Sequence, residues 1–197
     1  MELVNQTLLV RDTCRILDIG GEPEYWANLI DMLGPCCWHI TIVNLQTFVV
    51  EDNRFASIIG DARNLDQFSD MSFDIVHSNS VIEHVGRWQD MHAMAREVRR
   101  LAPAYFVQTP YFWFPIEPHC MTPLFHWLPE SVRVSMLMRR SRGHWSKAID
   151  IDEAMRKVQS AVLLDFQMLS SLFPDGRIAS EYVCGLTKSL IAIRTAA

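Results

Sequence analysis

The stretch CRILDIGG, residues 14–21, decides the fold class. Its first six residues are mostly apolar, which is typical of a strand buried in a parallel sheet. Gly20 and Gly21 follow as a turn, and Pro23 then opens a helix, because its missing N–H has no partner in the first turn anyway. A buried strand, a glycine turn and a helix predict the first unit of an α/β sheet.

Outward from this unit, apolar runs alternate with helical patterns, which predicts a sheet with helices on both faces. The first helix is expected to end at Gly34-Pro35, and a longer one spans residues 88–101. Asp165 is a good N-cap for a third. The connection at Gly185 is too short for a parallel crossover, so the two strands beside it must be antiparallel. Strands are expected at 40–43, 55–59, 73–77, 105–108, 177–184 and 186–193.

Residues 109–150 interrupt this alternation within a chain that we otherwise interpret as one domain, residues 1–197. The segment is too rich in proline for a regular helix or a central strand, and too aromatic for a solvated linker. We therefore expect a cap inserted over the carboxyl edge of the sheet. Its prolines are Pro110, Pro115, Pro118, Pro123 and Pro129, and its aromatic residues are Tyr111, Phe112, Trp113, Phe114, Phe125, Trp127 and Trp145.

Composition excludes several classes of protein. The net charge of −5 argues against nucleic acid as a partner, since phosphate backbones select basic surfaces. No apolar run approaches the roughly 20 residues of a membrane span, and no secretory signal is apparent at the N-terminus. The cysteines form no C-x-x-C pair, and Cys36, Cys37 and His39 are a weak match to a metal cluster, so no metal is expected. We expect reduced thiols and a cytoplasmic location.

Three motifs in fixed order resemble the class I S-adenosylmethionine-dependent methyltransferases, particularly the bacterial type-11 group. They are ILDIGG, GDARNL and SNSVIEH, and the resemblance covers about residues 14–108 and the last two strands. It implies a Rossmann-like, seven-stranded, mostly parallel sheet whose last strand is antiparallel. Two departures concern the cofactor: Glu22 and Glu24 replace later glycines of the first motif, and Asn44 replaces an acidic residue at the second strand's tip.

The resemblance implies S-adenosylmethionine as the cofactor, bound where strand order reverses. The first motif would contribute an acidic residue and a close backbone approach, the third-strand segment would meet the adenine, and the fourth-strand segment would line the methionine end. The implied cofactor residues are Asp18, Gly20, Gly21, Asn44, Leu45, Asp61, Ala62, Ser78 and Asn79.

The expected reaction is in-line displacement at the sulfonium methyl by an oxygen or nitrogen of a small organic acceptor recognised by the cap. If a proton must leave, His84 and His119 are the candidate general bases, because a neutral imidazole titrates near physiological pH. A non-catalytic module that binds a protein partner stays an alternative, as does a nicotinamide dehydrogenase. The acceptor's identity and the oligomeric state, a homodimer included, stay open.

Overall fold

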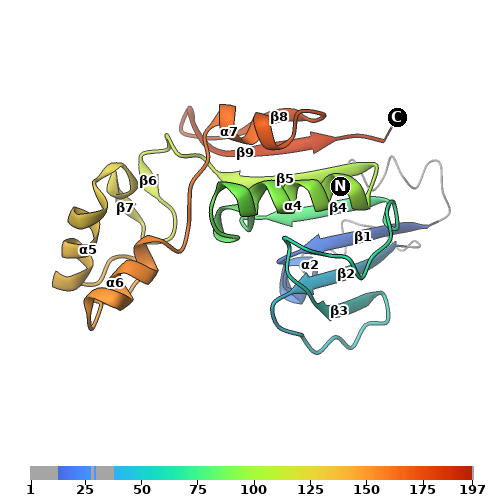
Figure 1. Cartoon of the computed structure of the whole chain (residues 1–197), viewed down its shortest axis with the longest axis horizontal. Helices are drawn as coiled ribbons and strands as arrows, with labels where there is room; N and C mark the ends of the chain where they lie inside the picture. Colours follow the sequence, from blue (N-terminus) through green and yellow to red (C-terminus); the bar gives the residue numbers. More distant parts are fainter. Residues whose placement is uncertain (1–12, 28, 30–37, 197) are drawn as a thin grey trace.

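A computed structural model describes residues 13–27, 29 and 38–196 of the chain (Figure 1). Its main sheet has seven strands in the order β3-β2-β1-β4-β5-β9-β8. The strands from β3 to β5 are parallel, and β9 is antiparallel to both of its neighbours. The predicted Rossmann-like sheet with one antiparallel strand is confirmed. The strands are β1 (Cys14–Ile19), β2 (Trp38–Asn44), β3 (Phe55–Ile59), β4 (Ile75–Asn79), β5 (Ala104–Pro110), β8 (Arg177–Val183) and β9 (Leu186–Arg194).

Helices pack on both faces of this sheet, as predicted. Successive strand side chains point to opposite faces. Leu17 therefore packs with α4 (Trp88–Leu101) and α7 (Phe166–Leu172), whereas Ile16 packs with Trp26 of α2 (Pro23–Ala27). The predicted end of the first helix, at residues 34–35, lies outside the described residues.

Local signals place most element boundaries. The Asp165 carboxylate accepts a hydrogen bond from the Met168 N–H at 2.8 Å and so caps α7, as predicted. The β8–β9 turn uses Cys184 and Gly185, which have φ values of 51° and 79°. β4 begins at Ile75, two residues later than predicted, since the Phe73 N–H bonds to the Leu101 carbonyl at the end of α4.

The insertion, defined here as residues 112–163, leaves the sheet after Tyr111 and returns at Leu164, and these two residues form a parallel bridge. It lies beyond the carboxyl ends of the parallel strands (Figure 1). Six buried side chains form its own small core: Cys120, Phe125, Leu137, Ala148, Ala154 and Val158. Its elements are β6 (Ile116–Glu117), β7 (Thr122–Pro123), η2 (Phe125–Trp127), α5 (Glu130–Arg139) and α6 (Ile151–Val158).

The insertion differs from the prediction in two respects. The expectation that proline excludes a regular helix is wrong, because α5 begins directly after Pro129 and contains no proline. The excursion also continues past residue 150, since α6 packs against α5 and adds Ala154 and Val158 to the apolar core.

Two chemical features bear on the class of protein. Within the described ranges, no helix is both long enough and apolar enough to cross a membrane. Cys120 and Cys184 carry free thiols.

Candidate active site

A cavity of about 390 Å³ opens at the carboxyl ends of β1 and β2 and beside the segments that follow β3 and β4. β1 lies between β2 and β4, so the strand order reverses here, and ligands of open α/β sheets bind at such points. Its volume lies within the usual range of ligand pockets, about 300–1,000 Å³. The residues around it are Ile19, Gly20, Val43, Asn44, Leu45, Gly60, Asp61, Ala62, Arg63, Ser80, Val81, His84 and Val85.

The glycine turn after β1 forms one wall. Gly20 has a φ of 75°, and a Cβ built there would lie 2.5 Å from a methyl carbon of Val81, so conformation and space both require glycine. Asn44 braces the turn from β2. Its Nδ2 donates to the carbonyls of Gly20 and Gly21 at 3.3 and 3.1 Å, and its Oδ1 accepts from the Leu45 N–H at 2.7 Å. The Asn44 amide thus already has partners within the protein.

Asp61 and Arg63 form the polar side of the cavity. The Asp61 carboxylate accepts from Arg63 Nε at 2.9 Å and from Nη2 at 2.6 Å. These hydrogen bonds, more than any other influence, hold the pKa of Asp61 below its usual range. The segment is fixed from behind by Glu97 of α4, which accepts from the Leu65 N–H at 3.0 Å.

Asp18 does not line the cavity. Strand alternation places its side chain on the face of Ile16, where it is buried. Trp26 Nε1 donates to Oδ2 at 2.6 Å, and His77 Nδ1 lies 2.7 Å from Oδ1. The other ring nitrogen of His77 is 3.3 Å from the Tyr25 hydroxyl. Both oxygens of the carboxylate are therefore engaged inside the protein.

Of the eleven predicted site residues, six line the cavity: Gly20, Asn44, Leu45, Asp61, Ala62 and His84. Five do not: Asp18, Gly21, Ser78, Asn79 and His119. Ser78 is buried and donates to the Ile19 carbonyl at 3.1 Å. Sequence reasoning missed Arg63, Ser80 and Val81, although each directly follows or lies within a motif that it had singled out.

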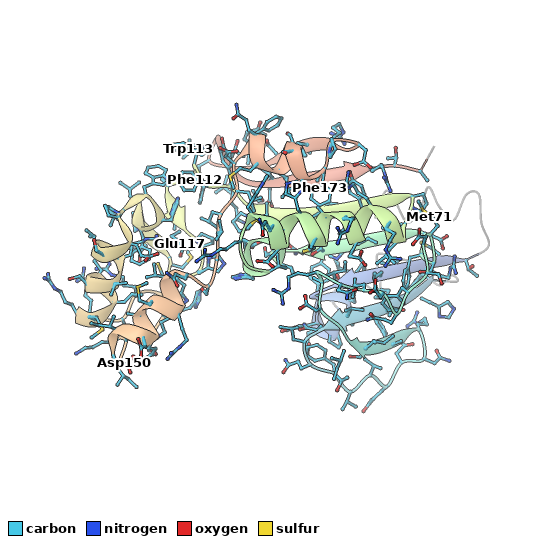
Figure 2. The ribbon with its side chains drawn as sticks, viewed as in Figure 1. Met71, Phe112, Trp113, Glu117, Asp150 and Phe173 are labelled. Carbon is cyan, nitrogen blue, oxygen red and sulfur yellow. The ribbon has the colours of Figure 1, made fainter. Side chains whose placement is uncertain are left out.

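His84 and His119 meet where the sheet and the insertion touch. Their Nε2 atoms are 3.0 Å apart, although the residues are 35 positions apart. His84 lies in η1 (Ile82–His84), and its Nδ1 is 2.7 Å from the Ser160 carbonyl. His119 Nδ1 is 2.6 Å from Oε1 of Glu117, a buried residue on the side of the insertion that faces the sheet (Figure 2). The two predicted bases are therefore brought together as one pair.

Two buried carboxylates flank this histidine pair. Burial raises the pKa of Glu83, which accepts a hydrogen bond from Thr109 at 3.0 Å. Burial alone would lower the pKa of His119, but the hydrogen bond and charge of Glu117 and the charge of Glu83 outweigh it. The pKa of His119 therefore lies above its ordinary value.

Comparison with known proteins finds a family that part of the chain resembles. Residues 17–103 match the sequence profile of a family described as a methyltransferase domain. This segment covers less than half of the chain, but it includes all residues around the cavity and nearly all of the three motifs. The sheet topology is the one that the resemblance predicts.

Solved structures similar to this chain support its fold. An S-adenosylmethionine-dependent methyltransferase of Methanosarcina mazei has a TM-score of 0.54 at 14% identity, with 98% of each chain covered. A chain in the complex of the Haloferax volcanii Trm112 methyltransferase activator with a methyltransferase has a TM-score of 0.55 at 12% identity, covering 98% of this chain and 88% of that one.

The fold is also shared more widely. A Rhodobacter sphaeroides structure named for zinc-dependent alcohol dehydrogenases has a TM-score of 0.58 at 10% identity, covering 100% of this chain and 90% of that one. At such identities the likeness concerns the fold alone. No curated protein matches the sequence. The likeness to the methyltransferase-domain family therefore rests on residues 17–103 and on the sheet topology.

A second cavity of the protein, of about 510 Å³, lies between the start of α4 and the insertion. Gly86 and Arg87 border it, whereas the preceding His84 and Val85 border the first cavity, so the two cavities flank one short segment. The insertion contributes Phe112, His126, Glu130 and Arg133 to its wall.

Proposed function

We propose that this protein transfers the methyl group of S-adenosylmethionine to a small organic acceptor. One observation carries the proposal: residues of all three motifs, far apart in sequence, line a single cavity at the switch point of the sheet. That cavity also lies within the part of the chain that matches the methyltransferase family.

The chemistry of the cavity fits this cofactor. Ile19, Val43 and Ala62 offer apolar surface for a flat base, while Asp61 and Ser80 offer polar groups near it. The absent side chain at Gly20 leaves the backbone open to close approach. In this proposal Gly20, Asn44, Leu45, Asp61 and Ala62 contact the cofactor directly.

Asp18 has a different role in the proposal. It acts as a positioning residue, because its carboxylate holds Trp26 and His77 beside the turn rather than facing the cavity. An added Cβ at Gly21 would overlap the Asp18 carboxylate, so these two residues also fix each other. Ser78 fixes the end of β4 to β1 in the same way, and Asn79 follows at the strand tip.

S-adenosylmethionine, when bound, supplies a methyl group that its sulfonium has already activated. A bond forms between the acceptor's oxygen or nitrogen and the methyl carbon as the methyl–sulfur bond breaks. The protein's task is to align the acceptor and to exclude water. We place the acceptor in the second cavity, because that cavity reaches the first across residues 84–87 and is walled by the insertion.

His84 and His119 are the proposed route for the acceptor's proton. His84 lines the cofactor cavity, so its imidazole lies close enough to accept a proton from the acceptor. Because the two Nε2 atoms are in contact, the rings act as one unit instead of as two independent bases.

Native mass spectrometry with added cofactor tests the proposal. We expect one equivalent of S-adenosylmethionine or its demethylated product on the protein, and no equivalent of NAD at the same concentration. Incubation with methyl-labelled cofactor and a library of small hydroxy and amino compounds should then label some of them. A protein that binds NAD in preference to S-adenosylmethionine would contradict the assignment.

One observation favours the alternative of a partner-binding module. Trp113 and Trp127 are 57% and 39% exposed, and their ring centroids are 5.9 Å apart. Exposed aromatic pairs suit protein contacts. A protein that binds the cofactor but methylates none of the compounds, and that loses a partner in the Trp113→Ala and Trp127→Ala variants, would support this alternative.

A further inference from the structure

Three potential metal ligands converge at the junction of the sheet and the insertion. Glu83, His84 and His119 each offer one ligand atom, and these atoms all lie within 4.8 Å of one another. Glu83 is buried, His119 is half-buried and His84 is exposed, so the group has a buried floor and an open side toward solvent. An ion could reach it without unfolding of the protein.

The hydrogen bonds of the two rings fix where their free lone pairs point. The Ser160 carbonyl can only accept, so Nδ1 of His84 carries the proton. Glu117 likewise accepts from Nδ1 of His119. In the neutral rings both Nε2 atoms are then unprotonated, and their lone pairs face each other at 3.0 Å. Such a contact is repulsive unless a cation, either a metal ion or a proton carried by one of the rings, lies between the two nitrogens.

The carboxylate of Glu83, the third potential ligand, can still accept a further partner. Oε2 of Glu83 accepts from Thr109 Oγ1, whereas Oε1 is buried and has no hydrogen-bond partner within the described part of the chain. A buried carboxylate oxygen is costly to leave unpaired, and a bound cation would satisfy it.

The surroundings match the outer shell of a metal site. A ligating histidine almost always donates its second ring N–H to a carboxylate or a backbone carbonyl, which fixes the ring and its tautomer. His119 donates to Glu117, and His84 donates to the Ser160 carbonyl. Glu117 is itself held by the Cys120 N–H at 2.7 Å. Both histidines are therefore pre-oriented with Nε2 aimed at a common point.

From this geometry we propose that Glu83, His84 and His119 bind a divalent transition-metal cation of the zinc type. Two imidazoles and one carboxylate form a ligand set that leaves the fourth position of a tetrahedral Zn²⁺ open. Zn–ligand distances of about 2.0–2.1 Å require ligand atoms roughly 3.3 Å apart, close to the separation of the two Nε2 atoms. The charges of Glu83 and Glu117 balance the ion.

The open position gives the site a role in the methyl transfer, and this part of the inference rests on the proposed function. His84 borders the cofactor cavity, so an acceptor oxygen bound to the cation would lie beside that cavity. The cation lowers the pKa of a hydroxyl that it binds, and the proton leaves to solvent. The site therefore favours acceptors that carry a hydroxyl group, and in this form the histidines are ligands instead of bases.

Calorimetric titration of the chelator-treated chain, residues 1–197, with Zn²⁺ tests the site. We expect one equivalent bound through His119, with affinity at least about a hundredfold weaker in His119→Ala and about 10–100-fold weaker in Glu117→Gln, which removes only outer-shell support. His144→Ala removes an exposed histidine of the same insertion and should leave the affinity unchanged. Glu83→Gln should also weaken binding, provided that its thermal midpoint stays near that of the wild type.

Two outcomes overturn the inference. The first is that the wild type binds no Zn²⁺, in which case a shared proton alone joins the histidines. The second is that His119→Ala keeps its full affinity, which would place the metal elsewhere in the chain. A parallel titration of the metal-free protein with S-adenosylmethionine keeps failure of the metal site distinct from failure of the proposed function.

Discussion

The sheet and the insertion differ in how their folds are held and in what they contribute. The sheet is built on parallel strands buried on both faces, with apolar clusters that run through β1, β4 and β5. The insertion has two short strands, short helices and a core of six buried side chains. The cavity at the carboxyl ends of β1 and β2 belongs to the sheet, whereas Glu117 comes from the insertion (Figure 2), as does its hydrogen-bond partner His119.

This difference suggests a division of labour. In the proposed function, the sheet supplies the surface for the methyl donor, and the insertion completes the surroundings of the acceptor. The two regions meet at η1, where His84 contacts both His119 and the Ser160 carbonyl. Variants on the two sides should therefore separate donor binding from turnover.

The largest effect is expected at the glycine turn of the sheet. Gly20→Val forces a β-branched residue to a φ of 75° and drives its Cβ into Val81, which lines the cavity. We expect S-adenosylmethionine affinity to fall at least about a hundredfold, or ~2.8 kcal/mol, in a calorimetric titration.

Gly185→Val is the matched control for that variant. Gly185 has a φ of 79°, but an added Cβ there meets nothing within 4 Å. It should cost about 1–2 kcal/mol of stability from backbone strain and leave cofactor affinity unchanged. Equal losses of affinity in both variants would show that strain, and not the cavity, matters.

The second prediction addresses the insertion. His119→Ala should lower turnover about a hundredfold, in the range typical of lost proton handling, while the dissociation constant for S-adenosylmethionine changes less than about twofold. Initial rates with an identified acceptor measure it, with His144→Ala as control. A parallel loss of cofactor affinity would mean that the two regions do not divide the work as described.

The third prediction compares one ion pair in each region, and the expected effect is a change in stability. Glu97–Arg100 in α4 and Glu153–Lys157 in α6 both have N–O distances of 2.7 Å. Glu97 is buried and also holds the Leu65 N–H of the segment that carries Asp61. Glu97→Gln should therefore lower stability by about 1–3 kcal/mol in urea denaturation, because a buried charged partner is lost. Glu153 also accepts a backbone N–H, from Ile149 at 2.8 Å, but its side chain is 25% exposed. Glu153→Gln should therefore lower stability by less than Glu97→Gln does, and an equal loss would contradict this difference between the two helices.

The pH dependence of Glu97 follows from its environment. Burial alone would raise the pKa of Glu97, but hydrogen bonds from Arg100 and from the Leu65 N–H outweigh it, so that pKa is lowered. A lowered carboxyl pKa contributes stability above the pKa of the unfolded chain, and that contribution is lost as the pH falls through the folded value. The difference in unfolding free energy between wild type and Glu97→Gln should thus be full at neutral pH and shrink in acid.

Thiol reactivity gives the smallest effect, and it tests whether the insertion core is closed. Burial raises the pKa of Cys120 to about 11, whereas Cys184 lies exposed in the β8–β9 turn. Alkylation at pH 8 followed by peptide mass mapping should modify Cys184 and spare Cys120. Rapid modification of Cys120 would show that the core opens readily.

The same contrast explains what the sequence could predict. In the sheet, β3 has the predicted bounds and Asp165 caps the predicted helix, because alternation, periodicity and caps are local signals. In the insertion, those signals fail: Pro129 suggested irregular structure, yet it stands just before α5, where a proline costs nothing.

The site residues that could be predicted are likewise those that depend on local sequence signals. Cavity residues next to the glycine turn could be predicted, because parallel strands end at one edge. The face of Asp18 could in principle be predicted from its alternation with Ile16, although its partners Trp26 and His77 could not. The meeting of His84 and His119 depends on the path of the insertion, which no sequence periodicity describes.

The central claim is that the sheet edge binds S-adenosylmethionine, and calorimetric titration of the wild-type protein tests it most directly. The account predicts a single saturable site for S-adenosylmethionine or its demethylated product. It also predicts that binding is lost in Gly20→Val and retained in His119→Ala. The absence of both heat and thermal stabilisation at millimolar cofactor would contradict it.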